Sequence, residues 1–192
     1  MRQVQAAGDG GAGVDPAPQI KHKIPRNVRV FVETSDEFFA EYEARVGGQR
    51  IGMAFIDGLH HFEQTLRDFI NIEKRASPDG LVLIHDCIPM DEASSSRERR
   101  TEFWSGDVWK CLAILMDYRA DLDIKVIGTA PTGLVIVRGL DVNSRALANQ
   151  YDDLVERYMS LSFADWKRRY APRVHPIASN PTDVAHALSS ER

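Results

Sequence analysis

The chain has 192 residues, of which 43% are hydrophobic and 27% charged, and its formal net charge is −4 at pH 7. This composition is typical of a soluble globular protein with enough residues for one sizeable core. The net negative charge gives no general attraction to nucleic acid or to an anionic membrane. No apolar run reaches the roughly 20 residues of a membrane span, and residues 1–13 lack the apolar region of a signal peptide.

The two cysteines, Cys87 and Cys111, lack the spacing of metal ligands, and nothing in the sequence supports a disulfide. We expect both to be reduced packing residues. The sequence therefore predicts a cytoplasmic protein that binds neither nucleic acid nor membrane.

The glycine-rich end of residues 1–13 has little apolar surface to bury and predicts a flexible arm. Gly8, Gly10 and Gly13 match the pattern GxGxxG, but no strand precedes them, so a phosphate-binding turn is not expected. A very short strand ends near Asp15. Further strands are predicted at 28–32, 53–56, 81–84, 124–127 and 134–137, the last two as an antiparallel pair.

Helices are predicted to start at Ser35, to span 61–76, to start at Asp107, and to span about 143–161. Strands that alternate with helices predict an α/β fold, a Rossmann-like and mostly parallel sheet flanked by helices. We assign this domain to residues 14–170 and expect residues 171–192 to be a disordered tail. The polar segment 89–106 is too long for a simple connector and is a candidate substrate lid, whose Ser94-Ser95-Ser96 run cannot bury a core.

Acidic residues follow two of the buried strands, in FIDGLHHFE (55–63) and LVLIHDC (81–87). Open α/β sheets bind ligands outside the carboxyl ends of their strands, so Asp57 and Asp86 should be neighbours at that edge. Two carboxylates suit Mg²⁺. If a neutral His85 is a further ligand, softer divalent ions such as Mn²⁺, Zn²⁺ or Fe²⁺ also become candidates. The alternative is that Asp86 caps the following loop while His85 is hydrogen-bonded in the core. A metal phosphohydrolase is disfavoured, because its His-Asp ligands lie on helices.

Three other residues have both a functional and a structural interpretation. His60 would project over the same edge as a general base, or it is a surface or capping group at a helix start. Asp15 would accept hydrogen bonds from a ribose diol, or it only forms a turn before Pro16. Asp68, midway along a helix, is predicted to be structural.

The order Asp57-Gly58-x-His60-x-Phe62, Asp68, Pro78-x-Gly80 and His85-Asp86 resembles the class I S-adenosylmethionine-dependent methyltransferases. Within them it looks most like the small-molecule and sugar O-methyltransferases with an Asp-Gly-x-His signature, over roughly residues 14–140. The resemblance implies a seven-stranded sheet whose last strand is antiparallel. It also implies methyl transfer from S-adenosylmethionine to a hydroxyl of a small molecule.

The same resemblance implies roles for individual residues. Asp15 would bind the cofactor's ribose, and Thr34, Ser35 and Asp36 would lie beside its adenine. Asp57 would contact the cofactor and take part in catalysis with His60 as the base. Mg²⁺ or another divalent metal would be held by Asp57, His85 and Asp86.

The family's first strand and its glycine loop should lie upstream of Asp15, and residues 1–14 are too few for that strand, its loop and the following helix. We therefore expect the first βα unit to be absent or replaced. The alternative function is a truncated, inactive methyltransferase-like module that acts in packing or partner binding. An open central strand and an unpaired edge would favour a homodimer.

Overall fold

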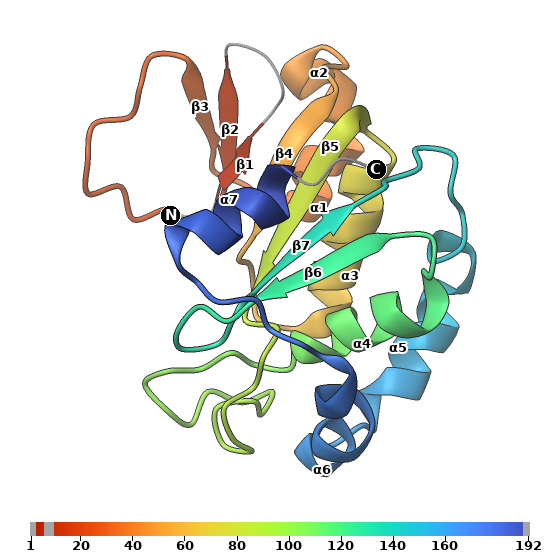
Figure 1. Ribbon diagram of the computed structural model, residues 1–192. Coiled ribbons are helices and arrows are strands. Elements are labelled where there is room, and N and C mark those ends of the chain that lie inside the picture. Colours follow the sequence, from red (N-terminus) through yellow and green to blue (C-terminus); the bar gives the residue numbers. More distant parts are fainter. Residues whose placement is uncertain (1–2, 6–9, 190–192) are drawn as a thin grey trace.

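The computed structural model describes residues 3–5 and 10–189. Its strands form one seven-stranded sheet in the order β3-β2-β1-β4-β5-β7-β6 (Figure 1). The strands are β1 (Gln3–Gln5), β2 (Gly11–Val14), β3 (Val28–Phe31), β4 (Ile51–Ile56), β5 (Ala76–His85), β6 (Asp123–Ile127) and β7 (Leu134–Arg138).

All strands except β1 and β7 run in the same direction. β2 is parallel to β3, and β4 is parallel to β5, whereas β7 is antiparallel to both β5 and β6. This arrangement confirms the predicted mostly parallel α/β sheet with an antiparallel last strand. β5 begins at Ala76 rather than at the predicted residue 81, and its first part is irregular, because the pairing with β4 shifts register there.

The position between β2 and β4 is occupied by β1, which runs antiparallel to both of these neighbours. β1 ends at Gln5 and β2 already begins at Gly11. A short reversed strand therefore lies where the resemblance predicted the first βα unit to be absent or replaced. The predicted flexible arm was wrong at residues 11–13, because small residues let β2 pack between β1 and β3. Residues 1–2 and 6–9 of that arm lie outside the described residues.

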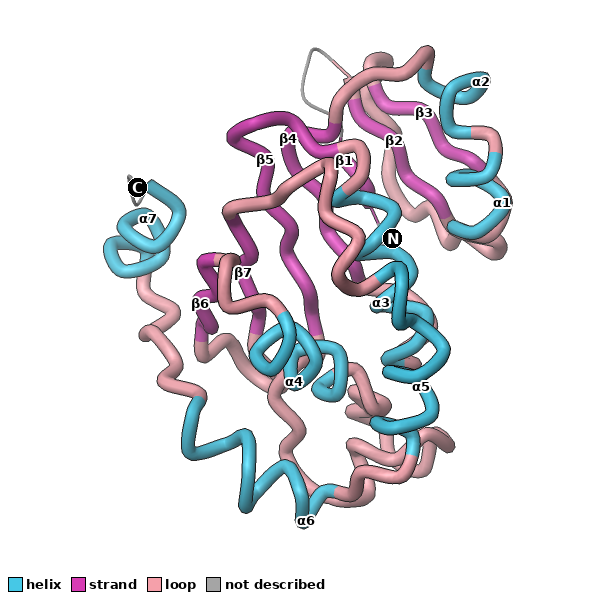
Figure 2. Tube along the Cα trace, turned by 90° about the vertical axis from the view of Figure 1, so that its right-hand side faces the viewer, coloured by secondary structure: helices cyan, strands magenta, loops and turns pink. Residues whose placement is uncertain are grey.

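The helices are α1 (Ser35–Ala40), α2 (Tyr42–Val46), α3 (Phe62–Glu73), α4 (Trp109–Tyr118), α5 (Tyr151–Met159), α6 (Phe163–Asp165) and α7 (Pro181–Ser189). Figure 2 shows α1, α3, α4 and α5 on one side of the sheet and α7 on the other. The predicted apolar face of α3 is confirmed, since Phe62, Leu66 and Phe69 are fully buried. Thr34 rather than Ser35 caps α1, in a capping box with Glu37.

The expected disordered tail was wrong for residues 171–189. Ile177 forms a bridge with Ile127 of β6, and Ala187 of α7 is buried against Ile127 and Ile136. Lys125 donates to the carbonyl oxygen of Ala187 at 3.4 Å, and Arg138 donates to that of Leu188. This segment is ordered because α7 buries the apolar face of β6 and β7 that it contacts. In addition, the basic side chains of Lys125 and Arg138 bond to carbonyl oxygens at the C-terminus of α7. In the described part of the chain, no helix is long and apolar enough to cross a membrane.

Candidate functional site

Asp57, His60 and Asp86 meet at the carboxyl ends of β4 and β5. The Nε2 atom of His60 lies 3.3 Å from Oδ1 of Asp57 and 3.2 Å from Oδ2 of Asp86. One ligand atom from each residue lies within 4.8 Å of the others, a spacing that could hold a metal ion. The predicted meeting of Asp57 and Asp86 follows from the parallel pairing of β4 with β5.

His60 and Asp86 both adopt the left-handed backbone conformation, with φ values of 61° and 62°. This conformation is uncommon for residues other than glycine and costs of order 1–3 kcal/mol each. The surrounding structure must supply the compensating contacts. Backbone strain at two neighbouring residues of one polar cluster is typical of a functional site.

The end of the loop between β5 and α4 holds His60 in place. The Nδ1 atom of His60 lies 2.8 Å from the backbone carbonyl oxygen of Trp104, and the two rings stack with centroids 5.1 Å apart. A carbonyl only accepts, so Nδ1 of His60 donates to it, and Nε2 faces the two carboxylates. The backbone of Gly106 passes so close that an added Cβ would lie 1.9 Å from the carbonyl oxygen of His60.

Asp86 is buried and is oriented from the other side by Thr132, whose hydroxyl donates to Oδ1 at 2.5 Å. Its Oδ2 atom therefore remains for the cluster. His85 lies beside the cluster rather than in the set of three, with Nδ1 at 3.2 Å from Oδ2 of Asp86 and 3.7 Å from Oδ1 of Asp57.

The two histidines change the acid–base properties of the site. Hydrogen bonds to Asp57 and Asp86 raise the pKa of His85 to about 10, against the opposing effect of burial. Burial raises the pKa of Asp57, but hydrogen bonds from His60 and His85 outweigh it and hold that pKa well below its usual value. Asp57 is thus ionised, and His85 is the cation that pairs with both carboxylates.

A cavity of about 180 Å³ lies beside the cluster, between the ends of β2 and β4 and the helices α1 and α3. Four of the predicted cofactor-binding residues line it, namely Asp15, Thr34, Ser35 and Asp57. Asp36 is not among the lining residues, because its carboxylate pairs with Arg67 at 3.1 Å. The structure therefore brings the predicted residues together, except for Asp36.

The polar groups of these residues also have local partners. Asp15 Oδ1 accepts from the backbone N–H of Ala17 at 2.8 Å, which is the turn interaction that the alternative interpretation predicts. The hydroxyl of Thr34 accepts from the N–H of Glu37 and donates to its carboxylate. The hydroxyl of Ser35 accepts from Gln64 Nε2 at 3.1 Å.

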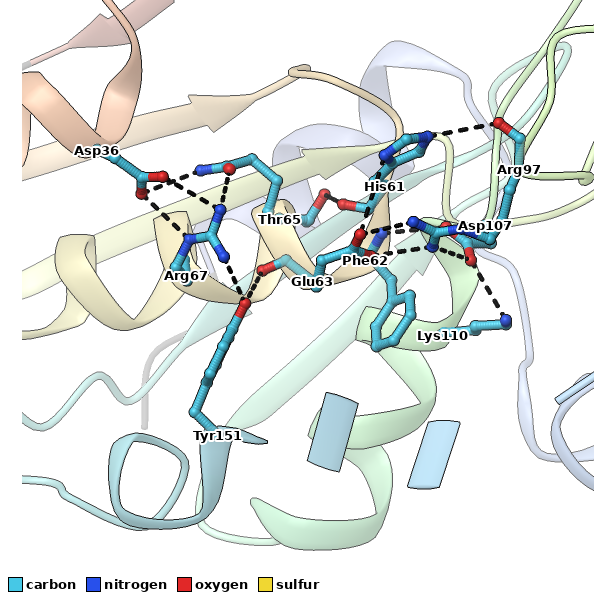
Figure 3. A network of polar contacts seen from close by, with 11 residues as sticks. Asp36, His61, Phe62, Glu63, Thr65, Arg67, Arg97, Asp107, Lys110 and Tyr151 are labelled. Carbon is cyan, nitrogen blue, oxygen red and sulfur yellow. Dashed lines mark hydrogen bonds and ion pairs between the residues drawn. The ribbon is translucent and has the colours of Figure 1, made fainter. Parts of the chain in front are cut away.

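The segment 89–106 is held against the N-terminus of α3 (Figure 3). Arg97 donates to Glu63 at 2.6 Å and 3.0 Å and to Asp107 at 2.8 Å, and Lys110 pairs with Asp107 at 3.2 Å. Asp107 does not cap α4 as predicted. Its Oδ1 accepts from the backbone N–H of Phe62, so it caps the facing end of α3.

Ser94 and Ser95 of this segment are buried, contrary to the expectation that the serine run cannot bury a core. Their hydroxyls bond to the carbonyl oxygen of Asp91, which offsets the cost of burying them.

Sequence reasoning missed two groups that orient the cluster. The carbonyl of Trp104 carries no side-chain signal. Thr132 could have been found, because β7 is antiparallel to β5 and begins opposite His85, which brings the preceding turn to the same edge of the sheet.

Comparisons with known proteins were consistent with this architecture. Residues 3–87 match a family model described as a methyltransferase domain. No curated protein matches the chain.

Three solved structures show partial similarity to the chain, which spans about half or less of the length of each. Cofactor-bound Rv0187 from MTB has 13% identity and a TM-score of 0.45, over 60% of this chain and 50% of that one. The O-methyltransferase TomG from Streptomyces achromogenes, in complex with SAM, has 18% identity and a TM-score of 0.43, over 58% and 49%. The methyltransferase MycE, in complex with Mg, SAH and mycinamycin VI, has 15% identity and a TM-score of 0.43, over 69% and 37%.

The family match ends at Cys87 and so includes both strand-end motifs and most of the cavity lining. Residues 3–87, less than half of the chain, are therefore similar to a methyltransferase domain.

Proposed function

We propose that the chain transfers a methyl group from S-adenosylmethionine to a hydroxyl of a small molecule, with assistance from a divalent metal. The observation that carries this proposal is the position of Asp57, which lines the cavity and also belongs to the cluster with His60 and Asp86. A cofactor in the cavity and an acceptor at the cluster would meet there.

The residues of the cluster fit a divalent ion. Asp57 and Asp86 each offer a carboxylate oxygen, and His60 offers Nε2, a donor set that suits Mg²⁺ and the softer Mn²⁺ or Zn²⁺. The bonds from Trp104 to Nδ1 and from Thr132 to Oδ1 are the outer contacts that usually orient metal ligands. An ion bound there would lower the pKa of the acceptor's hydroxyl.

The chain's own residues supply positioning and proton transfer. Where no ion occupies Nε2, His60 could instead take the proton of the acceptor hydroxyl there, and Asp57 and Asp86 would stabilise the resulting imidazolium. General base catalysis of this kind contributes about 10²–10⁴-fold to a rate. The sulfonium of the cofactor already activates the methyl group, so the protein mainly needs to align donor and acceptor.

Calorimetric titration with S-adenosylhomocysteine, with and without Mn²⁺, tests the proposal. We expect binding of both, weaker Mn²⁺ binding in Asp86→Asn, and unchanged binding in Asp152→Asn, a matched change on the exposed face of α5. Absence of S-adenosylhomocysteine binding by the folded chain would overturn the proposal. Binding of S-adenosylhomocysteine without Mn²⁺ would leave methyl transfer with His60 as a metal-free base.

The second candidate is the inactive module. The short reversed β1 favours it, because it stands where the family has the strand that leads into its glycine loop. The edge strand β3 and the exposed Val32, 68% accessible, would favour a homodimer. This candidate predicts no S-adenosylhomocysteine binding together with a dimer in analytical ultracentrifugation.

A further inference from the structure

Asp68 is a buried acid that lines the same cavity. It lies midway along α3, is only 7% exposed, and has an oxygen 3.8 Å from the point where a Cβ on Gly58 would lie. Sequence reasoning assigned it a structural role. We propose instead that Asp68 selects a ligand ring that carries an amino group, namely the adenine of the cofactor. This inference rests on the proposed function.

The carboxylate of Asp68 still has capacity to accept hydrogen bonds. Gln64 Nε2 donates to its Oδ1 at 3.1 Å, and the hydroxyl of Ser35 also bonds to the carboxylate. A carboxylate has about four acceptor positions, so these two neighbours leave room for a ligand donor. The adjacent cation, Arg67, bonds to Asp36, to the hydroxyl of Tyr151 and to Gln64 rather than directly to Asp68.

A buried carboxylate without a close cation is costly, so its presence in a cavity needs an explanation. Burial raises the pKa of Asp68 to about 6. An amine N–H that donates to this carboxylate would replace the hydrogen bonds to water that burial removed.

The rest of the lining matches a flat ring. Phe39, Ile56 and Ile72 give the cavity apolar walls, against which the faces of a ring can pack. Its acidic groups are acceptors only, which favours a ligand with N–H and O–H donors and a positive charge. The same acids disfavour a nucleotide that carries phosphate groups.

The selectivity has a direct chemical test, because hypoxanthine carries a carbonyl oxygen where adenine carries the amine. That oxygen would face the carboxylate of Asp68 without a proton between them. Leaving such buried groups unpaired costs about 1–3 kcal/mol, which corresponds to roughly 5–150-fold in affinity.

The experiment compares the binding of S-adenosylhomocysteine with that of its deaminated analogue, S-inosylhomocysteine, by calorimetry. We expect the unmodified chain to prefer the adenine compound by about tenfold or more. Asp68→Asn should lose most of this preference, because an amide can donate to the carbonyl. Gln64→Met, which removes the donor that orients Asp68, should reduce the preference in part. The control Asp152→Asn should keep it.

Equal affinity of the unmodified chain for both compounds would overturn this inference alone, as would an undiminished preference in the folded Asp68→Asn variant. Binding of neither compound would overturn the proposed function and this inference with it.

Discussion

His60 and Trp104 are joined twice, through a 2.8 Å contact between Nδ1 and a carbonyl oxygen and through stacked rings. Trp104 belongs to the loop that was predicted to be a lid, whereas His60 belongs to the cluster at the ends of β4 and β5. The position of the loop and the orientation of the imidazole are therefore coupled. A movement of the loop that displaces Trp104 would also remove the carbonyl oxygen that accepts the proton of His60 Nδ1.

Gly106→Ala should disturb this coupling directly. The glycine has φ of +57°, and an added Cβ would lie 1.9 Å from the carbonyl oxygen of His60, so the loop or His60 must move. We expect a loss of about 1–3 kcal/mol in the free energy of unfolding, measured in urea, together with weaker Mn²⁺ binding.

The matched control is Gly47→Ala, where φ is +64° but no atom lies within 4 Å of the added Cβ. That variant should lose only about 1–2 kcal/mol for its backbone conformation and should keep Mn²⁺ binding. Equal Mn²⁺ affinities in the two variants would contradict the role assigned to Gly106.

Arg97→Ala should loosen the segment 89–106. Arg97 bonds to both Glu63 and Asp107, and hydrogen bonds between charged groups contribute about 1.5–3 kcal/mol each. We expect trypsin to cleave after Arg99 and Arg100 about tenfold faster or more in the variant. S-adenosylhomocysteine and an acceptor bound together should slow cleavage of the unmodified chain.

Arg168→Ala is the control for this experiment, because it removes an exposed arginine that pairs with Asp165 outside the loop. Its cleavage rate at Arg99 and Arg100 should equal that of the unmodified chain. If Arg97→Ala shows the same rate as well, Arg97 does not hold the loop.

The sequence was sufficient to place Asp57 next to Asp86. Each follows a continuous apolar run, and such runs predict neighbouring buried strands whose carboxyl ends share one edge. The fold class followed from the same alternation of strands and helices.

The sequence was insufficient for β1 and α7, because the order of each depends on contacts with distant segments. The start of α7 does have a local signal, since the side-chain oxygen of Asn180 accepts from the backbone N–H of Asp183 and Pro181 is the first helical residue. β1 is a short strand whose pairing depends on the edges of β2 and β4. α7 is ordered by contact with Ile127 and Ile136, which lie more than 40 residues earlier in the chain. The positive φ values of His60 and Asp86 also depend on contacts that only the folded chain makes.

Asp68 should make the stability of the chain depend on pH. Burial raises its folded-state pKa from 3.8 to about 6, so the folded state holds this proton more tightly than the unfolded state. The free energy of unfolding should fall as pH rises from about 4 to about 6 and stay lower above that, by on the order of 2–3 kcal/mol. Asp68→Asn should remove this dependence and be more stable than the unmodified chain at pH 7, but not at pH 3.5. Urea unfolding at both pH values measures the stability difference between the variant and the unmodified chain. The same difference at pH 7 and at pH 3.5 would exclude Asp68 as the cause of the pH dependence.

Arg119 and Glu73 form a buried ion pair between α4 and α3 whose two partners should respond unequally to replacement. Arg119, 1% exposed, donates to the two carboxylate oxygens of Glu73 at 2.7 Å and 2.8 Å and also bonds to the exposed Asp121. Arg119→Met would leave the Glu73 charge buried without a cation and should cost about 3–5 kcal/mol in urea unfolding. Glu73→Gln should cost less, about 1–3 kcal/mol, because Arg119 keeps Asp121 as a partner. A larger loss in Glu73→Gln than in Arg119→Met would show that Asp121 does not compensate the buried arginine.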